Sequence, residues 1–554
     1  MIRSARWLLA LLSSAFLCSA ARTQTINAAS CNLTDVAAAL AGITTDGTTV
    51  VIPAGTCTWT TTLSYTQTHS FTLQGTGAVS GTGLISSIGG VGTDLTTIID
   101  GKDVAGNYSG VLVITTLAGK SFRLTGIAWG WAGTQTVAQY NGIVNVSGGS
   151  TSVRIDHNHF LHLGGKDILL VGGVLGVIDH NQFDGGSPLL SEFHLGVYMG
   201  GLYNDSSNIG NVSWTIPGDF GSANYLFVEN NNFEVVPIGG TTQRAFVYDC
   251  SYGGRVVFRF NALGYHELWQ THGTGSQGDI RGCRAFENYE NVNIFTTAAQ
   301  AAGGNDIPGT LYQMESGTGM IWGNTITYYG SIVQADVVRT NKLTYSQNPT
   351  PNGWGFCGTT YGPSNWDGNQ DSKGYPCVDG IGRGAGDLLS GVFPTKCNQT
   401  LGCSTYSGQS PRQALEPTYV FNNVYNPPAN YPDHYWTNTA PVSIAENRDY
   451  YLEIPNYGEP GTFNGTTGVG CGPAGSSACN NAVNRPSTCT TGVGFWDTSQ
   501  GNWNQSGSGP QGVFYACTAT NTWTLYYTPY TYPHPLATGT PAAIPPSAPN
   551  AQVH

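Results

Sequence analysis

The chain of 554 residues is acidic, because 21 lysines and arginines stand against 33 aspartates and glutamates, for a net charge of −12. Nucleic acids and anionic membranes both attract proteins through a basic face, so we expect neither as a partner. Hydrophobic residues make up 40% of the chain, which excludes a disordered protein, and the 76 glycines are typical of an extracellular β-protein.

The first 20 residues predict a secretory signal peptide. Two arginines precede an apolar run over residues 7–17, and small residues at 18–20 provide a cleavage site. The run is too short to span a bilayer comfortably. We therefore expect the mature chain to be secreted, either extracellular or periplasmic. A lipoprotein signal at Cys18 is the weaker alternative, because residues 15–17 are a poor lipobox.

Twelve cysteines remain after residue 20. An even number in an exported chain favours disulfides over metal thiolates or a free nucleophile. The sequence does not define their connectivity, and pairing between neighbours is the simplest expectation. That pairing gives Cys31–Cys57, Cys250–Cys283, Cys357–Cys377, Cys397–Cys403, Cys471–Cys479 and Cys489–Cys517.

A helix followed by a strand is expected over residues 33–59, LTDVAAALAGITTDGTTVVIPAGTCTW. Thr34 is the predicted N-cap, and Val36, Leu40 and Ile43 share one helical face. Helical signals are nearly absent after residue 45, so the rest of the chain is expected to be built from strands.

A repeat of the form apolar, two residues, Asn, one residue, apolar runs through the middle of the chain, at intervals that include 23 and 30 residues. Each unit contains short strands between Gly-rich turns. No unit could bury its apolar residues alone, so the units must stack. In a stack of parallel coils the amide side chains at one turn position bond to those of the next coil, which predicts scaffold asparagines. These are Asn158, Asn181, Asn231, Asn261, Asn291 and Asn324, and Asn423 also fits.

This repeat, together with residues 33–59, resembles the pectate lyase superfamily, whose members carry such an asparagine ladder. The resemblance covers roughly residues 30–345 and 415–455. It implies an all-β fold, a right-handed parallel β-helix or solenoid with an N-terminal helical cap and a disulfide-rich C-terminal region. The same fold hosts lyases, hydrolases, esterases, epimerases and binding proteins, so it does not by itself define a function.

The expected organisation follows from these segments. After the signal peptide at 1–20, residues 21–455 form the β-helix domain, with a Cys-rich insertion at about 346–412. Residues 456–536 are expected to form a disulfide-rich cap that covers the C-terminal end of the solenoid. The Pro- and Ala-rich residues 537–554 are expected to be a disordered tail.

Four histidines around the first two repeats, His157, His159, His162 and His180, could form a metal site. However, His157 and His180 occupy the same position on successive coils and would simply stack. His157 and His159 share one strand face, yet no third ligand is evident. We therefore prefer a scaffold role to metal binding.

A second candidate metal site is WDGNQDSKG at residues 366–374. Asp367, Asn369 and Asp371 stand at alternate positions, as in part of a calcium loop. The central glycine is missing, because Ser372 stands there, so an Asx-rich turn is the preferred interpretation. No cofactor is expected to be required, and calcium is an optional ligand.

Titratable residues gather on the strands that follow the ladder turns. Aligning residues 245–249, 268–272, 311–315 and 332–336 gives two neighbouring columns. The glutamine column is Gln270, Gln313 and Gln334, and the titratable column is Asp249, His272, Glu315 and Asp336. Residues two apart on a strand share a face, so both columns lie on one side of one sheet.

This side is expected to face outward, because carboxylates stacked in the interior would cost too much desolvation and repulsion. A plain solvated polar face is the alternative interpretation. The alternate residues are then the interior candidates: Phe246, Tyr248, Trp269, Thr271, Tyr312, Met314, Val333 and Ala335.

Stacked carboxylates beside an imidazole favour an enzyme that cleaves glycosidic bonds of a polysaccharide lying along the strand row. Polygalacturonases of this fold similarly place acidic groups on consecutive coils, although their Asn-Thr-Asp and Gly-His-Gly strings are missing here. In this hydrolase hypothesis Glu315, which has titratable neighbours on both sides, donates the proton. Asp249 or Asp336 serves as base or nucleophile, and His272 orients or tunes the donor.

Two alternatives stay open. A polysaccharide lyase would cleave a uronate-containing glycan by β-elimination, with His272 or a nearby basic residue as the base and calcium held by the carboxylates. The other is a non-catalytic glycan-binding or adhesion solenoid. The basic residues near enough in sequence are Arg244, Arg281, Arg284, Arg339 and Lys166. Arg244 and Arg339, with the glutamine column, are also the expected substrate-binding residues of a protein expected to act as a monomer.

Overall fold

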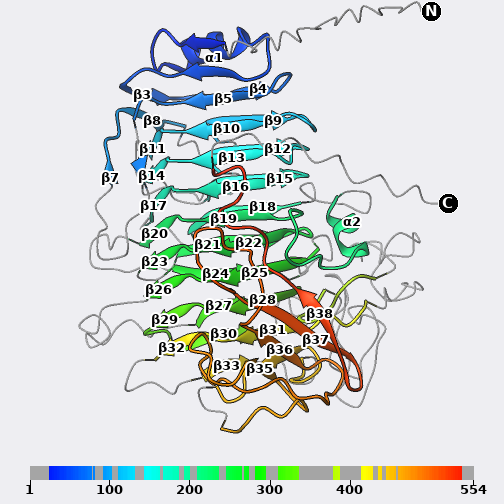
Figure 1. Cartoon of the computed structure of the whole chain (residues 1–554). Coiled ribbons are helices and arrows are strands. Elements are labelled where there is room, and N and C mark those ends of the chain that lie inside the picture. The colour runs from blue at the N-terminus through cyan, green and yellow to red at the C-terminus, as the bar shows by residue number, and fades with distance from the viewer. Residues whose placement is uncertain are drawn as a thin grey trace, which may run out of the picture.

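The computed structural model describes residues 24–77, 79–80, 91–102, 110–131, 142–161, 166–185, 192–199, 209–235, 245–264, 267–273, 281–294, 310–335, 379–386, 413–427, 434–438, 444–456 and 460–538. Three parallel sheets of 12, 10 and 10 strands follow one axis, and the chain visits them in turn (Figure 1). The fold is therefore a right-handed parallel β-helix, which confirms the predicted fold class.

The three sheets are named here in the order in which one coil passes through them. The first sheet contains β1 (Thr25–Asn27), β2 (Thr48–Val51), β5 (Phe71–Gln74), β10 (Phe122–Thr125), β13 (Val153–Asp156), β16 (Gly176–Asp179), β19 (Leu226–Glu229), β22 (Arg255–Arg259), β25 (Ala285–Tyr289), β28 (Thr318–Trp322), β31 (Thr418–Phe421) and β34 (Tyr450–Leu452). The second contains β3 (Gly55–Trp59), β8 (Thr96–Asp100), β11 (Ala128–Trp131), β14 (His159–Leu161), β17 (Gln182–Gly185), β20 (Asn232–Val235), β23 (Ala262–Gly264), β26 (Val292–Ile294), β29 (Thr325–Thr327) and β32 (Val424–Asn426). The third contains β4 (Leu63–Thr66), β9 (Leu112–Thr116), β12 (Val144–Gly148), β15 (Lys166–Gly172), β18 (Glu192–Tyr198), β21 (Ala245–Ser251), β24 (Glu267–Thr271), β27 (Thr310–Met314), β30 (Ser331–Ala335) and β33 (His434–Asn438).

Besides the three long sheets and a four-stranded C-terminal sheet, the described part of the chain contains four smaller elements. They are α1 (Leu33–Ala41), α2 (Ile209–Thr215) and the paired strands β6 (Val79–Ser80) and β7 (Val91–Gly92). Helix α1 lies at the N-terminal end of the solenoid (Figure 1). Its Val36 and Leu40 are buried in the core, as predicted, but the N-cap is Asn32 and not Thr34. The backbone is still extended at Asn32, with φ −66° and ψ 144°, so Thr34 already lies in the first helical turn.

The asparagine ladder is formed at the turn between the first and second sheets. Each ladder asparagine accepts a hydrogen bond at Oδ1 from the preceding one, as in the pair Asn158–Asn181, where the main-chain N and Nδ2 of Asn158 lie 2.9 and 3.1 Å from Oδ1 of Asn181. The chain of contacts continues without a break through Asn231, Asn261, Asn291 and Asn324 to Asn423. All seven predicted scaffold asparagines are confirmed.

The interior is a stack of apolar side chains that repeat from coil to coil. Phe160, Phe183 and Phe233, each two residues after a ladder asparagine, stack at 4.9 and 4.6 Å between ring centroids. In the third sheet Tyr248, Trp269, Tyr312 and Val333 are fully buried, as predicted, whereas Phe246 is only partly buried against the same core. The outward-facing side of the third sheet is therefore the side that carries the polar columns.

The C-terminal region packs along the outer face of the first sheet as well as beyond its last strand (Figure 1). It contains the four-stranded sheet β35 (Val469–Gly472), β36 (Gly494–Asp497), β37 (Val513–Ala519) and β38 (Thr522–Tyr527). Phe514 contacts Tyr419 of β31 at 4.7 Å between ring centroids. Farther back, the Arg259 guanidinium donates to the carbonyl of Tyr530 at 2.7 Å and to Glu229 at 2.8 Å. This cover buries both faces of the first sheet from β19 to β34.

Four of the six expected disulfides lie within the described residues and all four are confirmed: Cys31–Cys57, Cys250–Cys283, Cys471–Cys479 and Cys489–Cys517. Cys357, Cys377, Cys397 and Cys403 lie outside the described residues, as do most of the expected insertion at 346–412 and the tail from residue 539. Four disulfides indicate that the chain folds in an oxidising compartment. Within the described ranges, neither helix has the length and apolar character needed to cross a membrane.

Candidate active site

The strand register of the third sheet confirms the glutamine column. Gln270 pairs with Gln313, and Gln313 pairs with Gln334. The next residue pair, Thr271 and Met314, is also in register, so His272 and Glu315 follow at the same level on adjacent coils. This part of the titratable column is therefore as predicted.

The position predicted for Asp249 is wrong by two residues. Asp249 pairs with Gln270 in the glutamine column, and not with His272. Two differences add up: Ala245 pairs with Glu267 and not with Leu268, and a register shift between Phe246 and Tyr248 gives β21 one residue more than β24. A shift of two keeps the side chain on the same face. Asp249 therefore still points outward and meets His272 diagonally.

Asp249 is the centre of a buried polar cluster. Its Oδ1 lies 2.9 Å from Nδ1 of His272 and accepts from the Ser251 hydroxyl at 3.3 Å. Its Oδ2 accepts from the Tyr198 hydroxyl and lies 3.6 Å from Nζ of Lys166. Both carboxylate oxygens are thus engaged by neighbouring side chains. We refer to Lys166, Tyr198, Asp249 and His272 as the aspartate cluster.

Lys166 and Tyr198 reach Asp249 from two earlier coils, on β15 and β18. The Lys166 side chain passes over Gly196, where an added Cβ would lie 3.0 Å from its Cδ and Cε atoms and 2.6 Å from Cδ1 of Leu169. Nζ of Lys166 also lies 5.3 Å from the centroid of the Tyr198 ring. The missing side chain at Gly196 is therefore what leaves room for Lys166 to approach Asp249.

Electrostatics hold Asp249 in its ionised form. Burial acts to raise the pKa of this carboxyl, but the charge and hydrogen bond of His272, the charge of Lys166 and the Tyr198 hydroxyl together hold it well below its usual value. Burial lowers the pKa of Lys166, against the opposing effect of Asp249. A carboxylate that is ionised and already bonded through both oxygens is suited to orient a partner.

His272 is the least buried member of the aspartate cluster. Its side chain is 12% exposed, whereas Asp249 and Lys166 are each only 5% exposed. Since Nδ1 faces a carboxylate, that nitrogen carries a proton, which leaves Nε2 as the reactive nitrogen. Among the described residues, Nε2 of His272 has no hydrogen-bond partner. Oε1 of Gln270, also buried, has none within the same described ranges.

Glu315 adds a second carboxylate beside His272. Its Oε2 accepts from the main-chain N of Gly273 at 3.1 Å, and its Oε1 accepts from Nε2 of Gln313 at 3.3 Å. Its own main-chain N donates to the Thr271 carbonyl at 3.1 Å, which fixes the start of the side chain. These contacts hold both carboxylate oxygens of Glu315 in place. The arrangement therefore combines an oriented imidazole with a held carboxylate.

Several predicted site residues are not part of this arrangement. Asp336, Arg244 and Arg339 lie outside the described residues, and so do Asp367, Asn369 and Asp371 of the candidate calcium loop. Two of the basic residues considered as a base are paired elsewhere. Arg281 contacts Asp379 at 2.5 Å and Arg284 contacts Glu416 at 2.8 Å. Lys166 is the one of these basic residues that the described structure brings to Asp249.

The histidines near the first two repeats behave as scaffold residues. His157 and His180 stack at 5.4 Å between ring centroids, as predicted, and each bonds to the aspartate before it. His159 lies between Asp94 and Asp184, with both contacts at 2.9 Å. Burial acts to lower the pKa of His159, but the hydrogen bonds to Asp184 and Asp94 raise it to about 9. His162 lies outside the described residues, and the part of the chain that is described contains no His, Cys, Asp and Glu group that could hold a metal ion.

Sequence reasoning missed Tyr198 and Ser251, and treated Lys166 only as one of several bases. The signal for Tyr198 was present, because β18 pairs with β21 and places Tyr198 level with Ser251. Extending the strand alignment one coil earlier would have found it. The approach of Lys166 could not have been found in this way, because it is diagonal and depends on Gly196.

Comparison of the chain with protein-family models, with curated proteins and with solved structures found no match. The chemistry of the site must therefore be argued from its geometry.

Proposed function

We propose that the chain is a secreted enzyme of the pectate lyase-like superfamily that hydrolyses glycosidic bonds of a polysaccharide bound against the third sheet. The observation that carries this proposal is the meeting of Asp249, His272 and Glu315 at one end of neighbouring strands. A parallel β-helix is compatible with a polysaccharide-acting protein. The fold alone leaves the chemistry open, so the residues of the site must supply the argument.

The contacts favour roles for Asp249, His272 and Glu315 that differ from those expected from the sequence. Both oxygens of Asp249 are engaged by its partners, and this carboxylate orients His272. His272 then acts as the general acid and base through Nε2. Glu315, whose oxygens accept two hydrogen bonds, acts as the nucleophile. Asp336 is not needed in this assignment.

The reaction runs in two steps. The Glu315 carboxylate attacks the anomeric carbon while His272 gives its Nε2 proton to the departing glycosidic oxygen. Water then adds to the anomeric carbon, gives one proton to His272 and releases Glu315 as a carboxylate. His272 and Glu315 are on adjacent coils, about 4.8 Å apart along the stack. This spacing between coils is nearer to the about 5–5.5 Å that separates the two carboxyl groups of retaining enzymes than to the wider separation in inverting enzymes.

The charge of the site supports hydrolysis over elimination. Hydrolysis passes through a positively charged, oxocarbenium-like sugar, which the carboxylates of Glu315 and Asp249 stabilise. Elimination builds negative charge on a uronate and needs a cation there. Among the described residues, Lys166, Arg281 and Arg284 all contact a carboxylate already. One observation favours elimination as a second candidate, namely that Nε2 of His272 could also serve as the base.

A panel of polysaccharides scored in two ways tests the proposal. New reducing ends without ultraviolet absorbance, with the anomeric configuration retained in the first product, are expected. Absorbance from an unsaturated uronate would instead establish the lyase. Retained binding with no product from a broad panel would contradict both and indicate a binding solenoid.

The matched variants are Glu315→Gln and Glu453→Gln. Both residues are 2% exposed, but Glu453 follows β34 on the first sheet and contacts Asn422 rather than the site. Glu315→Gln should reduce kcat at least about 1,000-fold, a loss typical of a nucleophile. Glu453→Gln should keep kcat within about two-fold of wild type. Full activity in Glu315→Gln would remove this carboxylate from the mechanism.

A further inference from the structure

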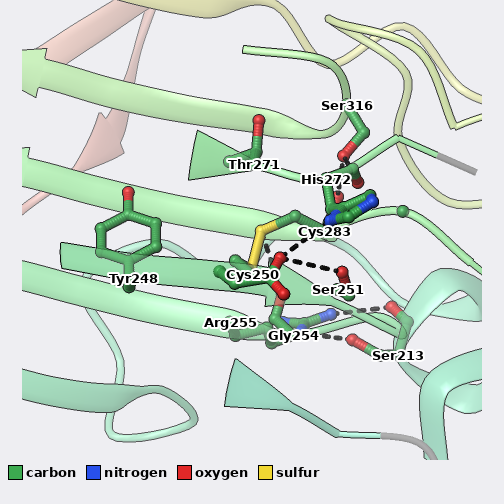
Figure 2. The surroundings of a disulfide bond; sticks show 12 residues. Ser213, Tyr248, Cys250, Ser251, Gly254, Arg255, Thr271, His272, Cys283 and Ser316 are labelled. Carbon is green, nitrogen blue, oxygen red and sulfur yellow. Dashed lines mark hydrogen bonds and ion pairs between the residues drawn. A yellow bond between two sulfur atoms is a disulfide. The ribbon is translucent and has the colours of Figure 1, made fainter. Parts of the chain in front are cut away.

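The disulfide Cys250–Cys283 closes one complete coil of the solenoid. The two cysteines are 33 residues apart in sequence, with Cα atoms 5.1 Å apart, and β22, β23 and β24 lie between them. Cys250 belongs to β21 and Cys283 precedes β25, so the bond joins the start of the coil that carries His272 to its end. Figure 2 shows the disulfide next to His272, with Ser251 and Ser316 nearby.

Both peptide groups of His272 are bound to the two cysteines. The main-chain N of His272 donates to the carbonyl of Cys250 at 2.9 Å, and the main-chain N of Cys283 donates to the carbonyl of His272 at 3.1 Å. The hydroxyl of Ser316 donates to the same His272 carbonyl at 2.6 Å. The backbone that carries the imidazole is therefore held between the two ends of the disulfide.

The same disulfide also fixes the partner of the imidazole, because Asp249 directly precedes Cys250. The disulfide lies close to an interruption of strand pairing in the third sheet. The register shift between Phe246 and Tyr248 interrupts the pairing of β21 with β24 just before Asp249, and such irregularities disrupt the ladder locally. The asparagine ladder cannot compensate, since it runs along the turn between the first and second sheets.

We propose that Cys250 and Cys283 are positioning residues of the active site, whose disulfide holds His272 in hydrogen-bonding register with Asp249. The proposal rests on the proposed function only where it concerns catalysis. The bond is a structural cross-link rather than a redox switch. Both cysteines are completely buried, so a reductant cannot reach them without local opening of the chain. Its loss leaves the solenoid folded and lets the imidazole leave its single orientation.

The test compares two disulfide deletions, Cys250→Ala with Cys283→Ala and Cys489→Ala with Cys517→Ala. The control bond lies in the C-terminal sheet and closes a loop of similar length, with a separation of 28 residues. The two deletions should therefore cost similar chain-entropy stabilisation. Histidine labelled with ¹⁵N reports the tautomer of His272 by NMR, with His272→Gln used to assign its signals. Wild type and the control deletion should show the Nδ1–H form alone at a pH where the ring is neutral, and the deletion at the site should show a mixture.

If the variant without the Cys250–Cys283 disulfide does not fold, Ser316→Ala provides a second test. Ser316→Ala removes one hydrogen bond to the His272 carbonyl and leaves the disulfide intact, so the same tautomer shift is expected at smaller amplitude. With a substrate in hand, the site deletion should lower kcat by up to about 100-fold with KM nearly unchanged, as expected for a small misplacement of a reacting group. A single Nδ1–H tautomer in the folded site deletion, or in Ser316→Ala if the deletion does not fold, would overturn the proposal. The NMR result stands apart from the polysaccharide panel, so failure of the proposed function is distinguishable from failure of this inference.

Discussion

Replacing Asn181 by alanine tests the ladder, because the side chain of this residue makes five hydrogen bonds while completely buried. Its Oδ1 accepts from the main-chain N and Nδ2 of Asn158 at 2.9 and 3.1 Å. Its Nδ2 donates to the carbonyls of Ile155 and Asp179 at 2.9 and 3.0 Å and to Oδ1 of Asn231 at 3.0 Å. The substitution removes all five at once.

The loss of stability is smaller than the removal of five hydrogen bonds would suggest, because most of the partner groups keep a second hydrogen bond. Nδ2 of Asn158 still donates to the carbonyls of Leu124 and Asp156, and Oδ1 of Asn231 still accepts from the main-chain N of Asn181. The main-chain N–H of Asn158 loses its acceptor, and one buried unsatisfied donor costs about 1–3 kcal/mol. With a small further loss from the other contacts, the free energy of unfolding should fall by about 2–3 kcal/mol.

Urea unfolding followed by tryptophan fluorescence measures this loss as a lower midpoint with an unchanged slope. Asn224 provides the control, because it is exposed and, within the described part of the chain, its amide bonds only to the exposed Asp219, at 2.7 Å. Asn224→Ala should change the free energy by less than about 0.5 kcal/mol. If Asn181→Ala were no more destabilising than Asn224→Ala, the ladder would not stabilise the solenoid and the reasoning would be refuted.

Three further outcomes follow from the described contacts. Gly196→Ala should push Lys166 away from Asp249 and lower kcat roughly 10-fold with little change in unfolding midpoint; unchanged kcat would show that this contact is dispensable. His159 has a folded pKa of about 9 against an ordinary 6.5, so its protonated form stabilises fully below about pH 6.5 and this contribution is lost as pH rises through 9. The difference in melting temperature between wild type and His159→Gln should accordingly be large at pH 6 and small at pH 10, and a constant difference would contradict the assignment. Burial raises the pKa of Glu287 to about 7 from an ordinary 4.5. The free energy of unfolding of the wild type should therefore fall by up to about 3 kcal/mol between pH 4.5 and pH 8. In Glu287→Gln this fall should be smaller, and an equal fall would contradict the assignment.

Much of the fold could be predicted because a solenoid makes its contacts between neighbouring coils. Asn158 and Asn181 share a position in the repeat, and that position alone places their amides in contact. Cys250 and Cys283 likewise pair across one coil. The helix start was misplaced by two residues, because local propensity did not show that the backbone at Asn32 is extended.

The site could be predicted only in part. His272 and Glu315 follow regular strands, so counting residues placed them on adjacent coils. Asp249 follows a register shift that adds one residue to β21, and Ala245 already pairs one residue earlier on β24 than the alignment placed it, so Asp249 is displaced by two positions. Lys166 reaches Asp249 across two coils through the space above Gly196.

The coil period, the asparagine ladder and most of the inward rows could be derived from the sequence alone, since each depends on residues one coil apart. The contact of Lys166 with Asp249, and the packing of residues 460–538 against the first sheet, could be seen only in the folded structure. The contact of Arg259 with Tyr530 joins residues 271 positions apart, and no repeat encodes it. Contacts between stacked coils follow directly from the repeat. Side-chain reach, irregular register and long-range packing instead depend on the folding of the whole chain.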